Sequence, residues 1–96
     1  MTTELEKGAF LLNFIAHPIR LDIIQTLAKF GYMTIEEINR QVKVDSHLLG
    51  HHVSLMRIKG IIKQDFIRDG RILYSLSSTI IDSAKLLSSL NLLTNK

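Results

Sequence analysis

The spacing of apolar residues changes at Gly60, and that change restricts the fold more than any other feature. Before Gly60, apolar residues recur every three or four positions, which is typical of amphipathic helices. After Gly60, β-branched and aromatic residues alternate with polar ones, as they do in strands. The dipeptide Asp69-Gly70 interrupts this second part, and Asp-Gly is the strongest short-range signal for a hairpin turn. The pattern therefore predicts a set of helices followed directly by one β-hairpin.

Helix boundaries can be placed from the residues that favour caps and turns. The first helix is expected over about 3–16, and the second begins after His17-Pro18, because proline suits the first turn of a helix. Gly31 ends this second helix. After the hairpin, a last helix is expected over about 79–93.

Two shorter helices are expected between Gly31 and Gly60. Thr34 and Glu37 have the spacing of a capping box, in which each residue caps the other's backbone, and this predicts a third helix over about 34–41. Asp45 or Ser46 can cap a fourth helix over about 46–59.

The order of these elements indicates a specific architecture for residues 1–96, which form a single domain. Two helices joined by a few residues, followed at once by a basic hairpin over about 62–76, outline a winged helix-turn-helix. The predicted fold is mainly α with a small β-hairpin, in the order α-α-α-α-β-β-α.

Composition excludes several classes of function. The chain has no cysteine, so it forms neither disulfides nor thiolate metal sites. The acidic start of the chain does not resemble a signal peptide, and no apolar stretch is long enough to cross a membrane, which together favour a cytoplasmic protein with no membrane partner. No phosphate-binding glycine loop and no nucleophile–base pair is recognisable, so we expect neither catalysis nor a cofactor.

The fourth helix and the hairpin hold the residues that we expect to contact double-stranded DNA. At about 100° per residue, the helix has an apolar face with His52 at its margin. Its opposite face is mainly small or polar, with Ile58 as the exception, and contains no acid. Small residues permit close approach to the major groove, and His and Ser side chains can hydrogen-bond to base edges. The alternative is an ordinary solvated helix face. The expected DNA-contacting residues are Ser46, His47, Gly50, His51, Ser54, Arg57, Lys59, Lys63, Arg68 and Arg71.

A net charge of +3 agrees with a polyanionic partner but is also an ordinary charge for solubility. His47 and His51 are four residues apart, a spacing that suits two zinc ligands on one helix face. Two ligands do not make a site, however, so no metal is expected.

The first and last helices are too apolar to be covered by one small domain, which predicts a homodimer formed through these two helices. A two-fold dimer also places two fourth helices about 34 Å apart, one turn of DNA. The alternative is that both helices only complete a monomeric core. The expected interface residues are Leu5, Ala9, Leu12, Ile80, Ala84, Leu87 and Leu90.

Three segments, in order along the chain, resemble the ArsR/SmtB family of bacterial and archaeal repressors. Residues 16–24, AHPIRLDII, resemble the family pattern A-D-P-T-R-L-x-I-L, and residues 51–62, HHVSLMRIKGII, resemble S-H-H-L-x-x-L-R-x-A-G-L-V. Residues 68–76, RDGRILYSL, resemble the wing pattern R-x-G-R-x-x-Y-x-L. The resemblance implies a dimeric repressor whose fourth helix reads the major groove and whose first and last helices form the interface.

The chain departs from this family at the positions that bind metal in many members. The family's cysteine pair falls at about Thr34 and Glu36, and its ligands on the last helix are reduced to Asp82, with no histidine after His52. Gly50 stands where the family often has serine. The residues identify no small-molecule effector. Two alternatives remain open: a winged-helix module that binds proteins and not DNA, or a sensor of a ligand or metal with a non-standard site.

Overall fold

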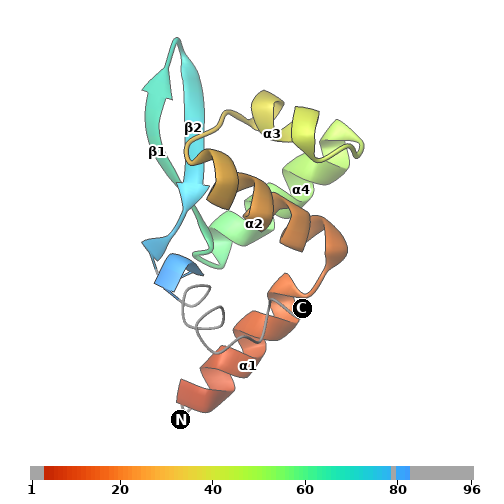
Figure 1. Cartoon of the computed structure of the whole chain (residues 1–96), viewed down its shortest axis with the longest axis vertical. Coiled ribbons are helices and arrows are strands. Elements are labelled where there is room, and N and C mark those ends of the chain that lie inside the picture. Colours follow the sequence, from red (N-terminus) through yellow and green to blue (C-terminus); the bar gives the residue numbers. More distant parts are fainter. Residues whose placement is uncertain (1–3, 79, 83–96) are drawn as a thin grey trace.

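A computed structural model describes residues 4–78 and 80–82 of the 96-residue chain. Figure 1 shows the second, third and fourth helices packed together, a hairpin along one side of them, and the first helix extending away at the end opposite the hairpin tip. This is the predicted winged helix-turn-helix arrangement. The elements are α1 (Glu4–Ile15), α2 (Pro18–Phe30), α3 (Ile35–Gln41), α4 (Ser46–Ile58), β1 (Ile62–Arg68) and β2 (Arg71–Leu76).

The ends of α2 and α3 follow from local hydrogen bonding. The side chain of His17 caps α2 by accepting from the backbone N–H of Ile19 at 3.1 Å, and Pro18 occupies the first turn. Gly31, at φ 87°, ends the helix in the left-handed region, which glycine adopts without steric cost. The capping box predicted for α3 is present, with Thr34 as its first residue.

The two strands pair antiparallel, and their turn is the predicted Asp69-Gly70 turn. Both turn residues have positive φ, 53° and 77°, which matches the twist of a two-residue hairpin. The register shifts between Gln64 and Ile67, where a bulge interrupts the ladder. An isolated antiparallel bridge from Met33 to Tyr74 adds the segment between α2 and α3 to the sheet.

One apolar core holds α2, α3, α4 and the base of the hairpin together. It contains the expected inward face of α4, and this packing fixes which face of α4 points to solvent. The largest fully buried side chains are Ile23, Leu27, Ile38, Leu49, Met56, Ile61, Ile62 and Val42.

The residues expected at a dimer interface have different environments. Ala9 and Leu12 of α1 are exposed, Leu12 by 51%. Ile80 does not fit the expected role, because it is only 4% exposed and belongs to the core of its own chain. Ala84, Leu87 and Leu90, and the part of the expected last helix beyond residue 82, lie outside the described residues, as does the side chain of Leu5.

Candidate nucleic-acid interface

The buried and exposed faces of α4 are those predicted from its periodicity. Leu49, His52, Val53 and Met56 are buried against the core. On the opposite side Gly50 is half-buried, and α4 contains no acidic residue. This exposed face holds five polar or basic side chains: Ser46, His47, His51, Ser54 and Arg57.

The start of α4 is fixed by Asp45, which lies just before the helix. Its carboxylate accepts hydrogen bonds from the backbone N–H groups of His47 and Leu48, at 3.0 and 3.2 Å. These bonds satisfy two of the amides that a helix leaves unpaired at its first turn. Ser46 is therefore the first residue of the helix rather than its cap, and its hydroxyl is exposed.

His52 connects the buried side of α4 to α1 and α2. The Arg20 side chain of α2 donates from Nε to Nδ1 of His52 at 3.1 Å and from Nη1 to the carbonyl of Phe14 at 2.9 Å. Because Nδ1 accepts a hydrogen bond, the ring is neutral and carries its proton on Nε2. Burial lowers the pKa of His52, and the positive charge of Arg20 lowers it further. His52 is thus a structural residue, as its position at the margin of the apolar face predicts.

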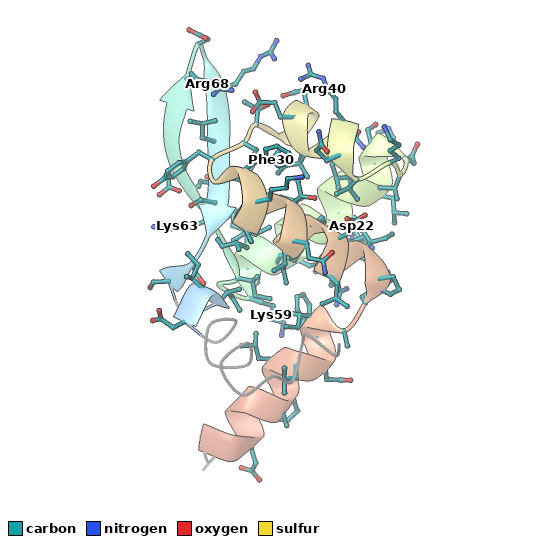
Figure 2. All side chains as sticks on the ribbon, in the orientation of Figure 1. Asp22, Phe30, Arg40, Lys59, Lys63 and Arg68 are labelled. Carbon is teal, nitrogen blue, oxygen red and sulfur yellow. The ribbon has the colours of Figure 1, made fainter. Side chains whose placement is uncertain are left out.

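The end of α3 and the turn that follows it contribute two basic residues that were not among those expected to contact DNA. Arg40 is exposed near the end of α3, and Lys43 follows it with its ammonium donating to the Arg40 carbonyl at 3.1 Å. Figure 2 shows Arg40 at the same edge of the molecule as Arg68 of the wing. The sequence did contain a signal for these two phosphate-binding candidates, namely two basic residues three positions apart at the end of α3 and in the connection to α4.

The two wing arginines differ in their partners. The Arg68 guanidinium donates from Nη2 to Oε2 of Glu37 on α3 at 2.7 Å. The bond from the Thr34 backbone N–H and the bond and charge of Arg68 hold the pKa of Glu37 below its usual value, so the carboxylate is charged. Arg71 is exposed, and among the described residues no ion pair forms with it.

The two expected lysines lie away from the wing tip (Figure 2). Lys63 is near the base of the hairpin and its ammonium is 3.5 Å from the carboxylate of Asp65. Lys59 follows the last residue of α4, and its ammonium lies 5.8 Å from the centre of the Phe14 ring of α1. The structure therefore does not bring Lys59 together with Arg68 and Arg71.

Thr34 is 2% exposed and its hydroxyl accepts from the Glu37 backbone N–H, so that hydroxyl serves the helix cap. Within residues 4–78 and 80–82, no three His, Cys, Asp or Glu side chains are grouped so that they could hold a metal ion. The described helices include none long and apolar enough to span a bilayer.

Comparison with known proteins finds matches among solved structures. The transcriptional repressor PagR of Bacillus anthracis is 31% identical, with 86% of this chain and 94% of PagR covered and a TM-score of 0.72. A predicted DNA-binding transcriptional regulator from E. coli is 26% identical, with 90% of each chain covered and a TM-score of 0.76. HlyU from Vibrio cholerae has the same fold, with 22% identity, 94% and 97% coverage and a TM-score of 0.77. No family model and no curated protein sequence matches the chain.

Proposed function

Because the chain belongs to the ArsR/SmtB family of winged helix-turn-helix transcriptional regulators, a non-enzymatic family, we propose that it binds double-stranded DNA as a homodimer and represses transcription. The observation that carries this proposal is the exposed face of α4, which contains no acid and lies beside a hairpin with two arginines near its tip. A helix that enters the major groove needs hydrogen-bonding groups and little bulk on the side that faces the bases.

In this proposal the face of α4 reads sequence. His51 and Ser54, four and seven residues after His47, lie on the same side of α4 as Gly50 and offer hydrogen-bonding groups to base edges. Replacing either polar side chain with alanine is expected to relax the preference for one base pair, at a cost of about 1–3 kcal/mol for the preferred sequence.

Basic residues around this face supply the contacts to phosphate. Arg71 on the wing, Arg57 at the end of α4 and Arg40 at the end of α3 are exposed, and none of them forms an ion pair with another described residue. A free guanidinium can take a phosphate oxygen without first giving up a carboxylate. Such contacts make binding depend on salt, because each one releases condensed counterions from the DNA.

The exposed apolar side chains of α1 support the dimer. Phe10 is 71% and Leu12 is 51% exposed on a helix that extends away from the rest of the fold (Figure 1). Apolar surface of this kind is stabilised when a second copy covers it. A two-fold pair would present two copies of α4 to successive major grooves, about 34 Å apart.

Selection of bound duplexes from a pool of random DNA tests the proposal. We expect recovery of a palindromic sequence with half-site centres about one helical turn apart, and binding that weakens steeply as salt increases. Recovery of no preferred sequence, together with binding that is insensitive to salt, would contradict the proposal. Light scattering of the purified protein measures the dimer separately.

A second candidate function, binding of a protein in place of DNA, is favoured by Ile58. This side chain is 72% exposed and lies at the end of α4, on the side proposed to face DNA. An apolar side chain of this size gains little from a phosphate backbone, whereas protein interfaces bury such residues at their centre. The selection experiment separates the two candidates, since a module that binds only protein recovers no duplex.

A further inference from the structure

We propose that Arg68 is a positioning residue that fixes the wing tip against α3 through Glu37, and that Arg71 is the wing arginine that contacts the DNA backbone. The inference rests on the proposed function, because it divides roles within the DNA-binding surface. Its starting point is the 2.7 Å contact between Arg68 Nη2 and Glu37 Oε2, two residues 31 positions apart in the chain. Both arginines had been expected to bind DNA in the same way.

The tip of the hairpin needs such an attachment because little else holds it. A two-stranded hairpin alone is at best marginally stable in water. Its base is tied by two backbone hydrogen bonds between Met33 and Tyr74, at 3.0 and 2.8 Å. Beyond the register shift at Gln64, the ladder retains the pairs Ile67↔Ile72 and Arg68↔Arg71. In the described part of the chain, the pair with Glu37 is the one hydrogen bond or ion pair that joins residues 67–72 to a helix.

Glu37 is held in place by bonds to Thr34 that do not involve Arg68. Its Oε1 accepts from the backbone N–H of Thr34 at 2.9 Å, while its own backbone N–H donates to the Thr34 hydroxyl at 3.2 Å. One oxygen of the Glu37 carboxylate therefore accepts a hydrogen bond within the capping box, and the other accepts from Arg68 of the wing. A partner fixed in this way loses less side-chain entropy on pairing than a free surface carboxylate does.

Binding a phosphate costs Arg68 an existing hydrogen bond, whereas it costs Arg71 none with a described residue. Arg68 and Arg71 are paired across the end of the hairpin, on either side of the turn. For Arg68 to bind a phosphate, the charged hydrogen bond to Glu37 must break, and the carboxylate is then left close to the DNA. Arg71 forms no such bond with another described residue. The phosphate contact is thus assigned to Arg71, and the orientation of the wing that delivers it is assigned to Arg68.

Glu37→Gln is the central variant, because glutamine still serves a capping box while the charge opposite Arg68 is lost. Glu36→Gln is its matched control, since Glu36 is exposed in the same turn of α3 and forms no ion pair with another described residue. Using a duplex recovered by selection, we expect Glu37→Gln to bind about threefold to fivefold more weakly than Glu36→Gln. Equal or tighter binding by Glu37→Gln would overturn the proposal, because it would mean that Glu37 restrains an arginine that DNA needs.

The salt dependence of binding separates positioning from phosphate contact. Loss of one phosphate contact reduces the slope of log K against log salt by about 0.9. We expect Arg71→Gln to reduce the slope by about this amount, and Arg68→Gln to weaken binding with the slope unchanged. The double variant Glu37→Gln/Arg68→Gln should bind as Arg68→Gln does. A reduced slope in Arg68→Gln, or an unchanged slope in Arg71→Gln, would refute the assignment.

A measurement without DNA keeps this inference separate from the proposed function. Hydrogen exchange of the backbone amides at residues 69–71 should be faster in Glu37→Gln than in Glu36→Gln, because the tip loses its link to α3. Equal exchange rates would show that the ion pair does not position the wing. If the protein binds no duplex at all, the proposed function fails, and the exchange rates still decide whether Arg68 and Glu37 hold the tip.

Discussion

Replacing Gly50 with alanine should make the protein more stable and its DNA binding weaker. Gly50 lies inside α4, where glycine costs about 1 kcal/mol relative to alanine. A Cβ built at this position meets no heavy atom of the described residues within 4 Å beyond the backbone of its own helix turns, so no packing contact in the described fold opposes the substitution. The gain of about 1 kcal/mol corresponds to a rise in Tm of about 4–8 °C in a domain of this size.

The same methyl group would lie on the face of α4 that we propose to face bases. If the helix approaches the groove closely there, the added carbon separates His51 and Ser54 from their partners. We expect affinity for a selected duplex to fall at least about fivefold, equivalent to about 1 kcal/mol. Thermal denaturation by circular dichroism and a fluorescence anisotropy titration measure the two effects on one sample.

Gly8→Ala in α1 is the control for helix propensity. Gly8 is also within a helix, and a Cβ built there likewise meets no heavy atom of the described residues within 4 Å beyond the backbone of its own helix turns. Gly8→Ala should raise Tm, and its affinity for DNA should be unchanged provided that light scattering shows the variant to keep the dimer, because α1 is proposed to form that dimer. If Gly50→Ala raises Tm and binds DNA as the wild type does, the argument from close approach is refuted. If Gly50→Ala does not raise Tm, the argument from helix propensity is refuted.

Further predictions concern stability. Because burial lowers the pKa of His52, the unfolded chain takes up the proton first, so stability is complete above about pH 6.5 and falls as the pH drops through the folded pKa. His52→Gln should reduce the loss of Tm between pH 7.5 and 5.5, and an equal loss in the variant and the wild type would contradict this. Leu49→Ala removes a fully buried side chain and should lower the urea-derived free energy of unfolding by about 2–5 kcal/mol, against less than about 1 kcal/mol for the half-exposed Leu48→Ala. Similar values for the two leucine variants would show that the inward face of α4 is assigned wrongly.

Features set by short stretches of sequence could be predicted, and features set by distant residues could not. The Asp69-Gly70 turn and the Thr34–Glu37 capping box depend on neighbours within four residues, and both are present. Ile80 was expected at a dimer interface, yet it lies in the core. Periodicity shows that a face is apolar, but it does not show whether that face packs on its own chain or on another.

The candidate site shows the same division. The exposed face of α4 followed from its period of 3.6 residues, whereas the partner of Arg68 did not follow from any local pattern. That partner depends on the orientation of the hairpin relative to α3. The bulge between Gln64 and Ile67 and the bridge from Met33 to Tyr74 both affect this orientation. Sequence identified the basic residues of the wing, and only the packing distinguishes the paired arginine from the free one.

Arg20 has a related effect on the orientation of α4. Apolar packing holds helices together but has no direction, so several crossing angles bury nearly the same area. The Arg20 guanidinium bonds at once to the carbonyl of Phe14 and to the ring of His52, and it also lies 4.0 Å from the centre of the Phe14 ring. Hydrogen bonds to two elements satisfy their geometry at few relative orientations. The angle between the helix proposed to form the dimer and the helix proposed to read DNA is therefore specified by the half-buried hydrogen bonds of Arg20 as well as by apolar packing.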